Sequence, residues 1–182
     1  MLQDPDQFPE HLERHRPKLV VIYEDDFNFL SKMCLTRMRK VAFTMTQVAH
    51  SLGAKVIAHG SDASDHAIEY LQHGIDHVLL GEAELTLVEL CDALLAARDT
   101  NGIAGLMNLD VRGRFGVLST KAPKPTPWPT LPPPARDLIE MEPYRDAWRS
   151  THGYFSLNLV ASRGCPYRCN WCAKPISYPS RE

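Results

Sequence analysis

The hydrophobic positions of the first 99 or so residues alternate between short apolar runs and longer stripes with helical spacing. Three short runs are typical of strands in a parallel sheet: residues 19–23, 55–58 and 77–80. Stripes with apolar residues three and four apart predict helices at about residues 4–15, 31–52, 64–74 and around 87–94. This alternation predicts a doubly wound α/β sheet of the flavodoxin or Rossmann type.

Details of this pattern give further expectations. The run 19–23 has no polar residue, so the strand should be buried on both faces. Ser31 is a candidate cap for the second helix, and Gly53 should end that helix in a left-handed conformation. The stripe of this helix that faces the core should consist of apolar residues three or four positions apart: Cys34, Met38, Val41, Met45, Val48 and Leu52. The last helix should bury Leu87, Leu90, Cys91 and Leu94, so both lone cysteines are expected in the core.

The chain changes character after this unit. Residues 103–109 and 115–118 are typical of a hairpin or two edge strands. Seven of the twelve residues from 123 to 134 are proline, which indicates a semi-rigid extended spacer. We therefore divide the chain into a domain of residues 1–120, a linker of 121–136 and the start of a second domain at 137–182. That last part should contain a helix started by Pro143 and a strand over 155–161.

Composition is that of an ordinary soluble protein. The 182 residues include 20 Lys and Arg against 22 Asp and Glu, a net charge of −2 that excludes a cationic nucleic-acid binder. No apolar run approaches the ~20 residues of a membrane helix, and the N-terminus is unlike a secretion signal. A cytoplasmic location is the expectation. Five cysteines, three of them within eight residues, favour metal binding over a disulfide framework.

The chemistry is concentrated at Cys165, Cys169 and Cys172, spaced C-x-x-x-C-x-x-C. Three thiolates in one loop can hold an iron–sulfur cluster and leave one iron without a protein ligand, open to a substrate or cofactor. A zinc site is the alternative, but zinc wants a fourth ligand. The nearest histidine, His152, lies 13 residues before Cys165, and this absence favours the cluster.

Basic residues surround the three cysteines without any acidic one: Arg163, Arg168 and Lys174. Two interpretations stay open. The cations can stabilise a reduced, anionic cluster and attract a carboxylate ligand. They can equally be solvated surface residues.

The segment Gly164–Cys172, preceded by an apolar strand, resembles the start of the radical S-adenosylmethionine (radical SAM) enzymes. In that family the three cysteines hold a 4Fe–4S cluster, and the amino and carboxylate groups of SAM bind the fourth iron. The resemblance implies that Cys165, Cys169 and Cys172 are cluster ligands. It also implies that Trp171 lies near the adenine of SAM. No catalytic acid or base is implied within this chain.

A second resemblance lies upstream. Gly81–Leu90 is similar to the G-E-x-E-x-T-x-x-E-L stretch of the cobalamin-binding domain that precedes many radical SAM barrels. Residues 134–138 and 141–144 are similar to the lead-in to that barrel. Ligands of such sheets bind at the carboxyl ends of strands. Those ends carry Glu24-Asp25, Gly60-Ser61-Asp62 and Gly81-Glu82, and four of these residues are the candidate cobalamin contacts: Gly60, Ser61, Gly81 and Glu82.

Two departures from the family qualify this interpretation. The D-x-H-x-x-G motif, whose histidine replaces the lower ligand of cobalamin in some relatives, is absent. Two readings stay open: cobalamin binding without that ligand, and a domain that has kept the fold and lost the cofactor. Only 29 residues run from Tyr154 to Glu182, whereas a (β/α)₈ barrel takes about 250. We therefore expect an N-terminal fragment with an incomplete barrel, too short to be active alone.

The resemblance implies an enzyme that cleaves SAM reductively for radical chemistry on an unactivated C–H bond, such as methylation, cyclisation or rearrangement. Its partners would be SAM, a small-molecule substrate and an electron donor such as flavodoxin or ferredoxin, with cobalamin as a further cofactor. The alternative is a non-catalytic module that binds cobalamin or a nucleotide and carries a vestigial barrel remnant.

Overall fold

The computed structural model describes residues 5–23, 34–109, 127 and 131–157. The chain forms two compact units, one of Leu2–Pro132 and one that includes Pro133–Glu182. The first unit contains a four-stranded sheet in the order β1-β2-β3-β4. Its strands are β1 (Leu19–Tyr23), β2 (Lys55–His59), β3 (His77–Leu79) and β4 (Leu106–Met107). The first three are parallel, and β4 is antiparallel to β3.

Helices precede and connect these strands. They are α1 (Phe8–His15), α3 (Leu35–Ser51), α4 (Ser61–Asp65), α5 (Ala67–Gln72) and α6 (Glu84–Leu95), with a 3-10 turn η1 (Pro5–Gln7) before α1. Among the described residues, no helix is both long enough and apolar enough to span a bilayer.

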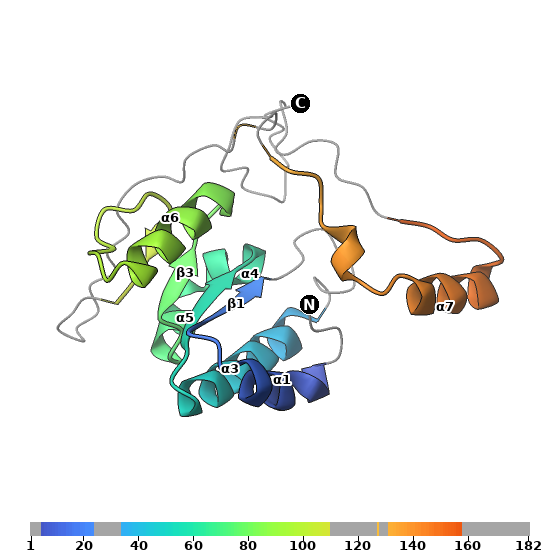
Figure 1. The fold of residues 1–182 in the computed structure, drawn as a ribbon, viewed down its shortest axis with the longest axis horizontal. Coiled ribbons are helices and arrows are strands. Elements are labelled where there is room, and N and C mark those ends of the chain that lie inside the picture. The colour runs from blue at the N-terminus through green and yellow to red at the C-terminus, as the bar shows by residue number, and fades with distance from the viewer. Residues whose placement is uncertain (1–4, 24–33, 110–126, 128–130, 158–182) are drawn as a thin grey trace. The chain divides into compact units, whose positions relative to one another are not determined.

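The sheet has a core on each face because neighbouring side chains of a strand point in opposite directions. Val56 and Ala58 of β2 pack with α1, α3, α4 and α5, whereas Ile57 packs with α6. Figure 1 shows α6 on one side of the sheet and α1 and α3 on the other. The predicted α/β sheet with helices on both faces is therefore confirmed. The strands follow one another in chain order across the described sheet.

The expectation that β1 is buried on both faces is wrong. Val20 is 9% exposed, but Val21 and Tyr23 on the opposite face are 39% and 52% exposed. The reason lies in the arrangement of the sheet. β1 ends the order of described strands, and the core under α6 draws on β2 and β3 but on no residue of β1.

The buried face of α3 also differs from the prediction. Its buried residues are Ala42, Thr46 and Ala49, small side chains that let the helix backbone approach the sheet. The larger predicted residues lie on the flanks: Met38 and Leu52 are exposed, and Val41, Met45 and Val48 are half-buried. Gly53 has the predicted left-handed backbone, with φ 78°. The prediction that Ser31 caps this helix is wrong: α3 begins at Leu35 and its N-cap is Cys34, and Ser31 itself lies outside the described residues.

The expectation that both lone cysteines are core residues is wrong for Cys34, whereas Cys91 is partly buried and packs against the core under α6. Cys34 is exposed and precedes α3 as its N-cap, and Cys91 is half-buried on α6. On α6 the fully buried residues are Thr86, Leu90 and Ala93. Leu90 of the predicted stripe is among them, and the other three residues of the stripe are partly buried and pack against the same core: Leu87, Cys91 and Leu94.

The helix predicted over 64–74 is divided in two. α4 begins at Ser61, three residues earlier than expected, and His66 interrupts the helical backbone with φ −120° before α5. Of the predicted edge strands in 103–120, β4 lies within 103–109. The segment 115–118 lies outside the described residues, as does most of the proline-rich linker.

The described part of the second unit contains the turn η3 (Arg136–Leu138) and α7 (Glu142–His152). Pro143 lies in the first turn of α7, as predicted. Tyr144 and Trp148 are 51% and 42% exposed, and α7 has no buried residue. Residues 155–157 are not in a strand, and the rest of the predicted strand 155–161 lies outside the described residues.

One prediction concerns a buried histidine of the sheet. His77 is 7% exposed, its Nδ1 donates a hydrogen bond to Oδ1 of Asn108 over 2.6 Å, and burial lowers its pKa. The unfolded chain therefore takes up a proton that the folded chain resists, so stability falls as pH drops below the ordinary histidine pKa of 6.5. We expect His77→Asn to reduce the loss of unfolding free energy between pH 7.5 and pH 5.5, measured by urea titration.

His15→Asn is the matched control, because His15 is exposed on α1. It should leave that pH dependence as it is in the unaltered chain. An equal pH dependence in the His77→Asn variant would contradict the prediction.

Candidate functional site

The carboxyl ends of β1, β2 and β3 lie side by side. Tyr23 and His59 are partners in the register of β1 and β2, and His59 and Leu79 are partners in β2 and β3. In open α/β sheets the ligand site lies outside this edge. The candidate residues Gly60 and Ser61 follow β2 directly, and Gly81 and Glu82 follow shortly after β3. The structure thus brings the two candidate pairs to one edge of the sheet.

A hydrogen bond from the last residue of β2 reaches the second candidate pair. Nε2 of His59 lies 2.9 Å from the carbonyl oxygen of Gly81. The ring of Tyr23 packs against His59, with ring centroids 4.3 Å apart and an angle of 31° between the planes. The side chain of His59 therefore links the ends of all three parallel strands.

The backbone at this edge requires glycine. Gly60 has φ 149° and ψ 170°, a region essentially restricted to glycine, and Gly81 has φ 65°. Gly60 is buried and Gly81 is half-buried, and neither position carries a side chain that could project over the strand ends. Ser61 is exposed, whereas Glu82 is only 6% exposed. The edge therefore offers one accessible hydroxyl-bearing residue and one buried carboxyl group.

A buried ionic network fixes the segment that follows Gly60. The side chain of Asp62 is 1% exposed. Arg39 of α3 donates to both of its oxygens, from Nε over 2.8 Å and from Nη2 over 2.6 Å. The Tyr70 hydroxyl donates to Oδ2 over 2.9 Å, and Arg39 also binds Glu69 over 2.6 Å. Asp62 thus ties α4 to both α3 and α5.

The environment of Asp62 keeps it ionised. Burial by itself raises the pKa of this carboxyl group, but the hydrogen bonds from Arg39 and Tyr70 outweigh that effect and lower the pKa. The same pairing raises the pKa of Arg39. A bidentate guanidinium–carboxylate pair is geometrically specific, so Asp62 orients the α4 segment. Its role at this edge is structural.

The candidate cluster residues lie outside the described part of the chain: Cys165, Cys169, Trp171 and Cys172. Glu24 and Asp25, at the end of β1, lie outside it too. Within the described ranges, no group of three His, Cys, Asp or Glu side chains is arranged to hold a metal ion. Any metal site of the described sheet edge would need ligands from elsewhere.

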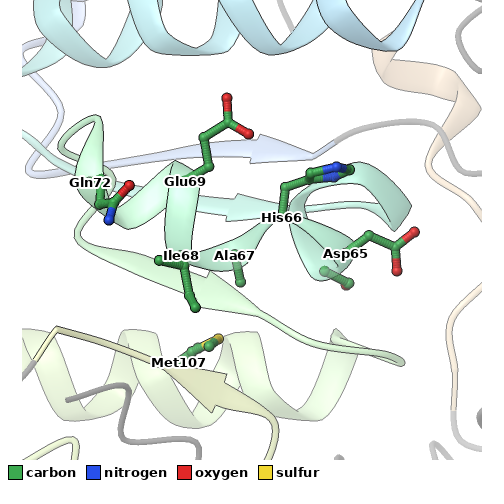
Figure 2. Close-up of a pocket in the computed structure, with 8 residues that line it drawn as sticks. Asp65, His66, Ala67, Ile68, Glu69, Gln72 and Met107 are labelled. Carbon is green, nitrogen blue, oxygen red and sulfur yellow. The ribbon is translucent and has the colours of Figure 1, made fainter. Parts of the chain in front are cut away.

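An open groove of about 380 Å³ is lined by residues of α4, α5 and β4. Figure 2 shows Ile68 of α5 and Met107 of β4 on its two sides. None of the four candidate cobalamin residues lines it. The groove is at the small end of the volumes typical of ligand pockets, too small to enclose a corrinoid.

Sequence reasoning missed two residues that shape the edge. His59 stands at the end of an apolar run, and its position after Ala58 could have marked it as the first polar side chain at the strand end. Arg39 gave no such signal, because 23 residues separate it from Asp62. The pairing of Arg39 with Asp62 can be recognised only once α3 and α4 are placed in the fold.

Comparison with known proteins gives the following matches. No protein-family model matches the chain. The uncharacterized methyltransferase PH0819 from Pyrococcus horikoshii is 33% identical over 109 residues, which are 59% of this chain and 22% of that protein. The chain thus spans about a fifth of the length of this curated relative.

Solved structures define the fold. The cobalamin-dependent S-adenosylmethionine radical enzyme OxsB, solved with aqua-cobalamin and S-adenosylmethionine bound, matches 93% of this chain with a TM-score of 0.67 and 18% identity. The match covers 22% of the OxsB chain. This chain shares the fold of that part of OxsB. The radical S-adenosylmethionine methyltransferase TsrM from Kitasatospora setae matches 70% of this chain and 22% of its own, with a TM-score of 0.49 and 23% identity.

The buried network gives a second prediction. Asp62→Asn keeps the shape of the side chain but removes the charge opposite Arg39, which is itself mostly buried. We expect it to lower the unfolding free energy by about 2–3 kcal/mol at pH 7, measured by urea titration. Because the pKa of Asp62 is lowered from 3.8, this difference should shrink as pH falls below about 4.

Asp65→Asn provides the control. Asp65 is also in α4 but is exposed, so its variant should change the unfolding free energy by less than about 0.5 kcal/mol. Equal effects of the two substitutions would show that the charge pair does not stabilise α4.

Proposed function

We propose that the chain is part of a radical SAM enzyme. In this proposal Cys165, Cys169 and Cys172 hold a 4Fe–4S cluster, and the α/β unit binds cobalamin. The observation that carries it is the C-x-x-x-C-x-x-C spacing, with its three thiolates and no fourth protein ligand nearby. Two findings support it: the shared fold with OxsB, and the sequence similarity to PH0819.

The sheet edge fits a large ligand in three respects. Gly60 is buried and Gly81 is half-buried, and both lack a side chain that would occupy the space beyond the strand ends. The edge is rigid, because His59 joins it to the β3–α6 segment and Asp62 joins it to α3. Ser61 is exposed there and adds a hydroxyl group. Because the sequence lacks the D-x-H-x-x-G motif, the proposal does not include a histidine of that motif as a cobalt ligand.

The cluster loop would bind SAM. When bound, the cluster supplies an electron for the reductive cleavage of SAM. The thiolates of the three cysteines hold the cluster and leave one iron for the amino and carboxylate groups of SAM. Trp171 would pack beside the adenine. Arg163, Arg168 and Lys174 would offset the negative charge of the reduced cluster.

Methyl transfer is the reaction class best supported, because the curated relative is named a methyltransferase. Cyclisation and rearrangement on an unactivated C–H bond are the other outcomes of the same chemistry. The substrate would be a small molecule, and the electron would come from a donor such as flavodoxin or ferredoxin. These properties belong to the whole enzyme, of which this chain would supply the α/β unit and the cluster loop.

Anaerobic reconstitution tests the cluster. The purified chain, incubated with iron and sulfide under reducing conditions, should become brown and bind about four irons per chain. Cys169→Ala should lose most of the bound iron and the charge-transfer absorption, since two thiolates remain. Metal analysis and visible absorption measure both quantities.

Two cysteines outside the motif provide matched controls. Cys34→Ala and Cys91→Ala remove one thiol each from the α/β unit and should leave the iron content unchanged. One zinc per chain, with no charge-transfer absorption, would refute the cluster. Equal iron loss in all three variants would show that the metal is bound without regard to the motif.

A further inference from the structure

The imidazole of His59 has one nitrogen that the fold satisfies and one that it does not. Only 3% of the residue is exposed. Nε2 lies 2.9 Å from the carbonyl oxygen of Gly81, and a carbonyl can only accept a hydrogen bond. In the neutral ring Nε2 therefore carries the hydrogen, and Nδ1 keeps a lone pair.

Nδ1 has no hydrogen-bond partner among the described residues, and it is buried. Buried polar atoms are nearly always hydrogen-bonded to protein, water or ligand, so an unpaired buried nitrogen can indicate a ligand site. The position of His59 in the sheet supports this interpretation. His59 is the last residue of β2, at the edge where open α/β sheets bind ligands, and it directly precedes Gly60, which has no side chain.

We propose that Nδ1 of His59 accepts a hydrogen bond from an amide N–H group of the bound corrinoid, which makes His59 a binding residue for that cofactor. The inference rests on the cobalamin-binding role proposed above. It adds the chemical group that this edge recognises, and it names a residue outside the candidate set of glycines, serine and glutamate.

The chemistry of the edge favours an amide donor. An acceptor nitrogen needs a donor, and a corrinoid carries several amide side chains around its ring. A phosphate has only acceptor oxygens, and the buried carboxyl group of Glu82 follows Gly81 on the same edge. Next to His59, the half-exposed ring of Tyr23 adds a flat apolar surface.

Cobalt coordination by the same nitrogen is less suited to this geometry. Nδ1 is the ring nitrogen next to Cβ, so the backbone of its own residue crowds it more than Nε2. A peripheral amide can reach such an atom more easily than the metal at the centre of a macrocycle. The other ring nitrogen is bound to Gly81, so turning the ring would break that hydrogen bond.

The test uses two variants of the full chain and hydroxocobalamin as the probe. His59→Gln can keep a donor for the Gly81 carbonyl but has no acceptor at the position of Nδ1. Its dissociation constant, from an absorbance titration, should rise about five- to tenfold, with an unchanged urea midpoint. His59→Asn carries a carbonyl oxygen near that position and loses the Gly81 contact, so it should bind more tightly than His59→Gln despite lower stability.

His77→Asn is the control, because His77 is a second buried histidine with an unpaired ring nitrogen, at the opposite end of β3. It should bind hydroxocobalamin like the unaltered chain. Three results would overturn the inference. In the first, His59→Gln binds as tightly as the unaltered chain. In the second, His77→Asn weakens binding as much as His59→Gln.

In the third, the electron paramagnetic resonance of bound cob(II)alamin shows coupling to a nitrogen of ¹⁵N-labelled histidine, and His59→Gln removes that coupling. This result would make His59 a cobalt ligand.

A different result separates the two proposals. If the unaltered chain does not bind hydroxocobalamin, the cobalamin-binding role itself fails, and the role of His59 fails with it. Reconstitution of the iron cluster would be unaffected by any of these outcomes.

Discussion

The burial of β2 on both faces is the constraint on which this unit depends. β2 pairs with β1 on one edge and with β3 on the other, and helices cover both faces. Val56, Ile57 and Ala58 are therefore each at most 1% exposed, and polar side chains are excluded until the strand ends. This concentrates the chemistry at the carboxyl end, where His59, Gly60 and Ser61 follow in sequence. The site is precise because the strand that presents it cannot move without opening both cores.

The contacts of Asp62 hold the chain in place beyond the end of β2. The Gly60 conformation turns the chain, and Asp62 is then anchored to a guanidinium from α3. A short helix such as α4 has little stability of its own. Its orientation is set by tertiary contacts, among which the charge-assisted hydrogen bonds of Asp62 are the strongest kind. The candidate site therefore lies between a buried strand and a buried ion pair.

Much of the fold could be predicted from the periodicity of the apolar residues, and the predictions that were wrong have physical causes. Strands β1, β2 and β3 were predicted from their apolar runs, and the helices between them were predicted from apolar residues three and four positions apart. The burial of β1 was overestimated, since an apolar run does not reveal whether a neighbour covers its far face. The core face of α3 was misplaced because helix approach selects Ala42, Thr46 and Ala49 over larger residues. Gly60 and Gly81 were placed at strand ends by the sequence pattern, and their role there stays a prediction. Arg39 and the hydrogen bond of His59 depend on packing, which a single sequence does not reveal.

The pair of Arg39 and Asp62 has a consequence for the evolution of this domain. Loss of Arg39 leaves the carboxylate of Asp62, 1% exposed, without its guanidinium partner, which is strongly destabilising, and loss of Asp62 leaves Arg39 paired with Glu69 alone. Replacement of both by apolar side chains of similar volume is often tolerated. The two positions should therefore change in concert among homologous chains, and covariation between them would trace the docking of α3 on α4 even where little else of the sequence is retained.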